Sequence, residues 1–267
     1  LIGWLCSFKG LFFLYLKHLI TYLFFLCLAI SALAHEHEHD LPIKYQENKG
    51  QWNKDLFFFG QASNIDIMVG DGKFMLQLKS QEDFDLIGNH HHGWAEMPDD
   101  FMVRFHNIEF DLIDANPTQP LGQKKAHDYV NYFLGNDPEK WAGGVNQFGE
   151  IRMPEVYPNV DFFLSSLGSH MKYEFRLASG AELEKIKFKI SGADKLYLND
   201  NKLHIENSVD LLIDERPIAW QIVNGEKVFV RCHYILNQDT LGFKVDGYDK
   251  SYPCLLYTSD AADEEDS

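Results

Sequence analysis

The sequence lacks the features by which many enzymes and nucleic-acid-binding proteins are recognised. Its 24 lysine and arginine residues stand against 40 acidic ones, and the formal net charge is −16. Phosphate binding needs a basic face and no Lys/Arg cluster occurs, which argues against a nucleic-acid partner. The zinc signatures HExxH and paired CxxC are missing, as are the GxSxG elbow, the P-loop and the dinucleotide fingerprint.

Cysteine is scarce and irregularly placed. The four cysteines are Cys6, Cys27, Cys232 and Cys254, and their spacing is not that of a metal or redox motif. The composition is 45% hydrophobic, 14% aromatic and 24% charged, which is typical of a globular protein rather than a disordered one. At 267 residues, the chain has room for one large β domain or two small ones.

The first 34 residues contain no acidic side chain and predict a secretory signal peptide. An apolar stretch follows Lys17 and His18 and ends in the small-residue pattern Ala32-Leu33-Ala34. We therefore expect residues 1–34 to be removed by cleavage before His35, with an uncleaved signal anchor as the alternative. This interpretation makes the protein secreted, extracellular or displayed on the outer cell surface. Residues 35–46 are expected to form a polar lead-in.

The C-terminal residues 254–267 are unusual for a natural sequence. The string CLLYTSDAADE, from Cys254 to Glu264, resembles the translation of a transposase sequencing adapter. We expect residues 254–267 to be a non-native tail outside the fold, with a genuine acidic tail as the alternative. The β-rich module itself is then predicted at 47–253, with two subdomains divided near 145–155 as one arrangement.

Alternating apolar and polar residues predict β-hairpins along the module. Residues 65–78 alternate around Gly70-Asp71-Gly72, and residues 160–177 alternate around a Ser/Gly turn. Further turns are expected at Asn199-Asp200-Asn201 and Asn224-Gly225. We therefore predict an all-β, mostly antiparallel fold, built as a β-sandwich or as open-barrel-like sheets from successive hairpins.

Helix is expected to be scarce. An N-cap and a proline at the first helical position predict one short helix near 137–141. The stretch from Ser80 to Asp100 has no sustained periodicity, and we predict a long loop there.

Two histidine-rich segments contain residue types that can bind metal ions. Residues 35–40 read His-Glu-His-Glu-His-Asp, but a chain terminus supplies neither fixed geometry nor oriented supporting partners, so a solvated polar tail is favoured. His90, His91 and His92 are consecutive and would point in opposite directions in an extended chain. A surface loop is favoured there, and neither a metal site nor a cofactor site is predicted.

Carboxylates and tryptophans offer two further candidates. Asp161 and Glu174 could lie on facing strands of one hairpin as a glycosidase-like pair. However, we expect Glu174 on the solvated face, with Tyr173 and Phe175 buried. Trp52, Trp94 and Trp141 could stack on sugar rings, but aromatic residues are more often core or turn anchors. No catalytic residue is predicted.

Several short motifs together carry a resemblance to a known family. They occur in the order ENKGQW at 47–52, VNYFLGNDP at 130–138, VYPNVD at 156–161, YEF at 173–175, SGADKL at 191–196 and Arg216-Pro217. The set resembles the uncharacterised N-terminal domain that precedes SBBP-type seven-bladed β-propeller repeats in secreted bacterial proteins. Many such chains end in a gliding-motility or type IX secretion sorting domain. In these relatives an Ile-Asp-Pro type strand follows the final proline and leads into the propeller blades.

The resemblance implies a non-catalytic extracellular structural or interaction module rather than an enzyme. Its implied partner is the downstream β-propeller of the same protein, with an extracellular glycan or protein as a further ligand. Membrane contact is expected only through the signal segment. The alternative function is a carbohydrate-binding or carbohydrate-active module that acts through Trp94 and nearby acids.

Overall fold

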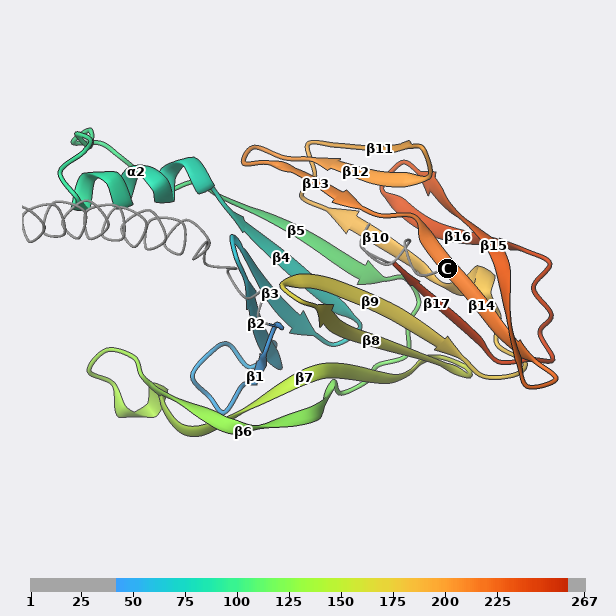
Figure 1. Cartoon of the computed structure of the whole chain (residues 1–267). Helices are drawn as coiled ribbons and strands as arrows, with labels where there is room; N and C mark the ends of the chain where they lie inside the picture. The colour runs from blue at the N-terminus through green and yellow to red at the C-terminus, as the bar shows by residue number, and fades with distance from the viewer. Residues whose placement is uncertain (1–41, 259–267) are drawn as a thin grey trace, which may run out of the picture. The chain divides into compact units, whose positions relative to one another are not determined.

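A computed structural model describes residues 42–258, which form an all-β domain with one α-helix and two short 3-10 helices (Figure 1). Its elements are β1 (Tyr45–Glu47), β2 (Phe58–Ala62), β3 (Ile65–Gly70), β4 (Lys73–Lys79), α2 (Gln81–His91), β5 (Phe105–Leu112), β6 (Leu121–Phe133), η1 (Pro138–Lys140), β7 (Trp141–Tyr157), β8 (Val160–Leu167), β9 (His170–Leu177), η2 (Leu183–Lys185), β10 (Lys187–Ser191), β11 (Lys195–Asn199), β12 (Lys202–Glu206), β13 (Leu211–Asp214), β14 (Pro217–Val223), β15 (Glu226–Asn237), β16 (Thr240–Asp246) and β17 (Cys254–Thr258). The predicted all-β class is confirmed.

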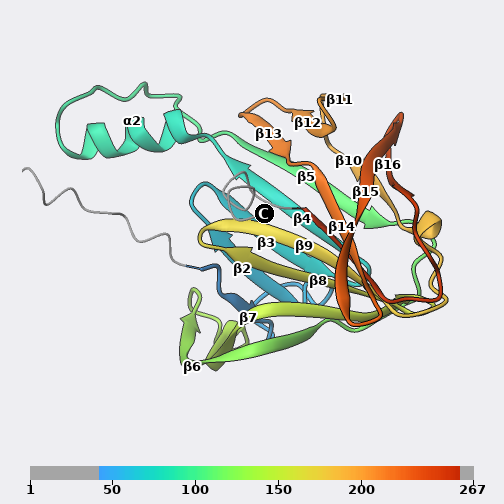
Figure 2. The ribbon, with the colours of Figure 1, turned by 45° about the vertical axis from the view of Figure 1, so that its right-hand side comes forward.

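The strands of this region form one large curved sheet and one small sheet (Figure 1, Figure 2). The large sheet has 14 strands among the described residues, in the order β1-β2-β3-β4-β5-β10-β16-β15-β14-β17-β9-β8-β7-β6. A short additional pairing joins β1 to β7, so the curved sheet approaches itself without becoming a true barrel. The small sheet is β11-β12-β13. Neighbouring strands run antiparallel, as the alternation predicted.

The predicted hairpins form with the expected turns. In β3–β4, Ile65 pairs with Leu78 and Gly70 with Lys73. Asn224 and Gly225, between β14 and β15, have φ of 53° and 87°. Two successive positive φ values match the right-handed twist of paired strands, which is why Asn-Gly favours this turn. The Asn224-Gly225 turn therefore sets the register between β14 and β15.

Strand β7 runs without a break from Trp141 to Tyr157, through the region where two subdomains could have divided. It pairs with β1, β6 and β8, and all of these belong to the same sheet.

The polar lead-in was expected to extend to residue 46, but the core begins earlier. Ile43 and Tyr45 are already buried in it. Residues 1–41, which include the predicted signal peptide and the His35–Asp40 segment, lie outside the described residues.

The prediction of a loop from Ser80 to Asp100 is wrong in its first half, where α2 forms. Ser80 caps the helix by accepting a hydrogen bond from the Asp83 backbone N–H, and histidines lie in the last turn. These features favour the helix termini. The sequence shows no amphipathic pattern for this helix, because α2 buries no apolar side chain and Asp83 is its one buried residue. The short helix near 137–141 is confirmed as η1, capped by Asp137.

The expectation that residues 254–267 lie outside the fold is wrong for residues 254–258, whereas the adapter origin of this segment stays a prediction. Residues Cys254–Thr258 form β17, which pairs with β14 on one side and β9 on the other. Leu256 is fully buried, and Cys254 and Thr258 are nearly so. The short apolar segment suits a half-buried strand, and an unfilled position between two strands supplies its hydrogen-bonding partners. Residues 259–267 lie outside the described residues.

Within residues 42–258, no helix has the length and apolar character needed to span a membrane.

Gly192 explains part of the SGADKL motif and gives a test of the fold. Its φ is +93°, and a Cβ added there would lie 2.1 Å from the backbone oxygen of Asn107. Gly192→Ala should therefore lower the free energy of unfolding by about 2 to 3 kcal/mol, measured by equilibrium denaturation.

Gly88→Ala is the matched control for this substitution. Gly88 lies in α2 with open space around its Cβ position, so alanine should stabilise the helix by up to about 1 kcal/mol. Equal destabilisation by the two substitutions would contradict the close approach between Gly192 and Asn107.

Candidate functional site

The three consecutive histidines lie at the end of α2 and do not converge. His90 and His91 are in its last turn, and His92 is its C-cap. The His90 ring contacts the Ala95 carbonyl oxygen at 3.1 Å, whereas the His92 ring stacks on Trp94 at a centroid distance of 4.8 Å. Across residues 42–258, no three His, Cys, Asp or Glu side chains gather closely enough to hold a metal ion.

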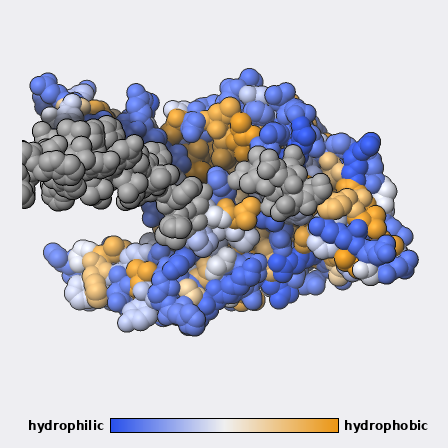
Figure 3. All heavy atoms as spheres, in the orientation of Figure 1, coloured by the Kyte–Doolittle hydropathy of each residue, from blue (hydrophilic) through white to orange (hydrophobic). Residues whose placement is uncertain are grey.

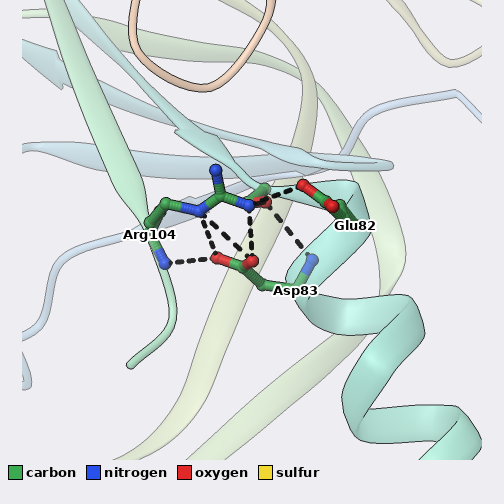
Figure 4. Close-up of polar contacts among 4 residues, drawn as sticks. Glu82, Asp83 and Arg104 are labelled. Carbon is green, nitrogen blue, oxygen red and sulfur yellow. Dashed lines mark hydrogen bonds and ion pairs between the residues drawn. The ribbon is translucent and has the colours of Figure 1, made fainter. Parts of the chain in front are cut away.

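One charged cluster holds the start of α2 against the chain that returns from it (Figure 4). Arg104 donates from Nε to Asp83 Oδ2 at 2.9 Å and from Nη2 to Asp83 Oδ1 at 2.6 Å. Its guanidinium also reaches Glu82, and its backbone N–H donates to Asp83. These hydrogen bonds from Arg104 lower the pKa of Asp83 to about 2. The cluster is an anchor for α2, which extends away from the ends of β4 and β5 (Figure 2).

Removing this anchor should loosen α2 alone. Arg104→Gln leaves the buried Asp83 carboxylate without its guanidinium, and we expect hydrogen exchange of the α2 amides to rise about tenfold or more while the strands stay protected. Glu82→Gln is the matched control because Glu82 also contacts Arg104 but is 85% exposed, and it should change exchange little. Uniform loss of protection in the Arg104 variant would contradict a local anchor.

Asp161 and Glu174 lie on the β8–β9 hairpin, as predicted, but each carboxylate is held by its own arginine. Arg152 donates to Asp161 Oδ2 from Nη2 at 2.7 Å, and Arg176 forms an ion pair with Glu174. The arginines bind these carboxylates as structural ion pairs that join neighbouring strand positions.

The expectation that Glu174 faces water is wrong, since the residue is only 9% exposed. Its cross-strand neighbours are Phe163 on β8 and Tyr257 on β17, whose large side chains cover it. Tyr173 and Phe175, on the other face of β9, are buried as predicted.

The three tryptophans differ in their surroundings. Trp52 packs against Phe59 and Tyr132 at centroid distances of 5.3 and 5.2 Å, as an anchor of the ENKGQW segment. Trp141 donates from Nε1 to the Gly135 carbonyl oxygen and is partly exposed. Trp94 is 76% exposed and contacts His92. Of these three tryptophans, Trp94 and Trp141 are therefore the two that offer exposed ring surface to a ligand.

A second acid, which the sequence did not single out, lies where the two sheets meet. Asp214 is the last residue of β13, in the small sheet. Its Oδ2 accepts hydrogen bonds from the Tyr173 hydroxyl on β9 at 2.7 Å and from the Tyr234 hydroxyl on β15 at 2.8 Å. Asp214 thus connects the small sheet to two strands of the large one.

The surroundings of Asp214 disfavour its charged form. Burial is the largest effect and raises the pKa of Asp214 to about 6, although the hydroxyls of Tyr173, Tyr234 and Thr258 lower it and Glu215 raises it further. The residue as a whole is half-buried, and its carboxylate accepts hydrogen bonds from the three hydroxyl groups. The pKa values of Tyr173 and Tyr234 are raised well above 10, first by burial.

Asp214 lies at a cavity of about 180 Å³. The cavity is lined by residues of β2, β3, β4, β5, β9, β13 and β17 and of the turns before β3 and β9: Ala62, Ser63, Asn64, Ile65, Ile67, Phe74, Leu76, Phe110, Ser169, His170, Met171, Tyr173, Leu212, Ile213, Asp214 and Thr258. Figure 3 shows apolar residues gathered on this face of the molecule, over β5 and β13. The site is therefore an apolar cavity with a carboxyl group in its wall.

The sequence alone gives little sign of this site, because Leu211, Leu212 and Ile213 before Asp214 are all apolar and show no alternation. In the folded β13 the residues alternate between exposed and half-buried, with Leu212 and Asp214 on the more buried side. An acid at an inward position of an alternating strand is uncommon, because a buried carboxyl group requires hydrogen-bonding partners. Its two tyrosine partners are distant in sequence and could not be identified from it.

Fold and site together define an all-β domain whose curved antiparallel sheet carries a small second sheet and a buried acid between the two. Residues 45–256 match the family described as "Domain of unknown function (DUF7948)", and the chain belongs to this family. No curated protein and no solved structure matches the chain.

Stability should depend on pH through Asp214. Its pKa is raised from 3.8 to about 6 in the fold, so the protonated acid contributes stability that is complete below about pH 4 and lost as the pH rises through about 6. Between pH 4 and pH 7 the stability of the natural chain relative to Asp214→Asn should fall by about 2 to 3 kcal/mol. Urea denaturation at several pH values measures the difference.

Tyr234→Phe provides the internal control. It removes one hydroxyl that donates to the carboxylate, so the pKa of Asp214 should rise and the transition should move to higher pH. A difference between the natural chain and Asp214→Asn that does not change with pH would contradict this description of Asp214.

Proposed function

We propose that this domain is a non-catalytic module of a secreted or surface-displayed bacterial protein, and that it supports a β-propeller that follows it. The observation that carries the proposal is the position of β17. In the relatives that the sequence motifs resemble, the segment after the final proline is the strand that leads into the propeller. Here the adapter-like segment directly after Pro253 lies inside the sheet, between β9 and β14, and we infer that the corresponding strand of the natural continuation takes this position. A strand paired on both sides gives the next domain a rigid attachment.

The ion pairs of the strands agree with a structural role. The two carboxylates that could have formed a glycosidase-like pair, Asp161 and Glu174, each bind an arginine. Arg176 also lies over the Phe163 ring at 3.6 Å and contacts the buried Glu150. Carboxylates committed in this way stabilise the strand arrangement and are not poised for proton transfer.

The unfolding of a longer chain tests the proposal. We expect a chain that carries its genomic continuation beyond Pro253, through the propeller, to unfold in one calorimetric transition. We also expect it to have a higher Tm than a chain that stops at Pro253, because the latter leaves β9 and β14 each without one of its two neighbouring strands. Two independent transitions, with the first unchanged by the blades, would contradict rigid support.

A carbohydrate-binding module is the second candidate function, and the exposure of Trp94 and Trp141 favours it. A glycan array with the full chain distinguishes the two. Binding that is lost in both Trp94→Ala and Trp141→Ala would establish the second function. Trp52→Ala is the comparison, because Trp52 packs against Phe59 and Tyr132 and should affect stability rather than glycan binding.

A further inference from the structure

Asp214 differs from the other buried carboxylates in the kind of partner it has. Asp83 and Glu174 each contact an arginine, and Glu150 contacts both Arg176 and a lysine. In the described part of the chain, no lysine, arginine or histidine nitrogen lies within ion-pair distance of Asp214. Its partners are the hydroxyls of Tyr173, Tyr234 and Thr258. When Asp214 ionises, its negative charge is therefore partly withdrawn from water with no cation beside it, which is costly unless a cation is supplied.

The cavity beside Asp214 has the size of a small organic group. Its volume of about 180 Å³ is comparable to that of an engineered apolar cavity of about 150 Å³ that binds benzene. Most of its wall is aliphatic or aromatic, with contributions from Ile65, Leu76 and Leu212. Polar side chains other than Asp214 and Tyr173 come from Ser63, Asn64, Ser169, His170 and Thr258.

Aromatic rings in the same wall suit a positively charged group. Phe74 and Phe110 stack with a centroid distance of 4.7 Å, and Tyr173 lies 6.3 Å from Phe74. All three line the cavity. Aromatic faces attract ammonium groups, and the attraction grows where water is excluded. A carboxylate and aromatic rings around one cavity are complementary to an ammonium group on an apolar body.

We propose that this cavity binds a small organic amine, with its primary ammonium group paired to Asp214 and its apolar or aromatic body against Phe74, Phe110 and the aliphatic wall.

Other ligand classes fit these surroundings less well. An anionic ligand would be repelled by the Asp214 carboxylate, and a plain hydrocarbon would leave that charge unpaired. A calcium ion takes 6 to 8 oxygen ligands, whereas this wall supplies one carboxylate whose Oδ2 already accepts two hydroxyl hydrogen bonds. The amine is the class that uses both the charge and the apolar volume.

The test compares two ligands of nearly the same shape. Benzylamine, which is protonated at pH 8, and benzyl alcohol, which is neutral, are titrated into the full chain and followed by NMR. We expect benzylamine to bind at least tenfold more tightly than benzyl alcohol. Equal affinity for the two, or no binding of either, would overturn the proposal.

Two variants assign the preference to Asp214. Asp214→Asn should abolish the tenfold preference for benzylamine while the cavity keeps its shape. Glu215→Gln is the matched control, because it removes the neighbouring negative charge, which pairs with Lys202 at 2.7 Å, and should keep the preference. Thermal unfolding of each variant verifies that it is folded. A preference that survives in folded Asp214→Asn would overturn the assignment.

A third ligand separates the two sources of an ammonium group. Nα-acetyl-lysine amide carries the group as a protein side chain would, whereas benzylamine represents a free amine. Tighter binding of the lysine derivative indicates that the site receives a partner's lysine, and tighter binding of benzylamine indicates a free amine. Both results support an ammonium site at Asp214. The test is independent of β-propeller support, which is measured by unfolding alone.

Discussion

Aromatic rings that meet across the interior of the large sheet determine its curvature. Phe74 on β4 and Phe188 on β10 contact Phe162 on β8, and Phe175 on β9 lies 4.9 Å from Phe162 and 5.7 Å from Phe188. In the strand order, the four strands β16, β15, β14 and β17 lie between β10 and β9, and β4 and β8 lie further out on either side. These rings can touch only if the sheet bends round them, and each pair adds about 0.5 to 1.5 kcal/mol to the burial of its surface. The cavity lies beside this cluster, since Phe74 and Tyr173 belong to both.

The sequence predicted the local pairings and not the order of the sheet. Asn224-Gly225 and alternating residues specify hairpins within a short segment, so those predictions are confirmed. Contacts such as β10 with β5 and β17 with β9 join distant segments, and every candidate strand has a similar apolar face. Glu174 was placed in water for the same reason, because alternation cannot show that Phe163 and Tyr257 would cover it. The Asp214 site depends on three distant strands and was missed.

The acids of the domain are stabilised in two different ways, with opposite effects on protonation. A guanidinium group beside Asp83 lowers its pKa to about 2 and keeps the carboxylate charged. Burial with hydroxyl partners alone raises the pKa of Asp214 to about 6. An acid that serves only to connect two sheets would be more stable with an arginine or as an uncharged amide. An acid without a cation at this position is consistent with the proposed amine ligand, which would supply the missing positive charge.

The proposed amine site and the proposed attachment of a following domain share β17. Thr258 lines the cavity and acts on Asp214, while Leu256, two residues earlier, pairs with Phe175 of the aromatic cluster. A ligand paired with Asp214 would change the charge balance around the Thr258 hydroxyl at the end of β17, the strand to which the proposed function attaches a following domain. If the ligand binds more tightly when β17 is in this position, then ligand binding also stabilises β17 in this position, because coupling between two sites is reciprocal. The two proposals therefore connect through one strand, and an occupied cavity would hold the following domain more firmly than an empty one.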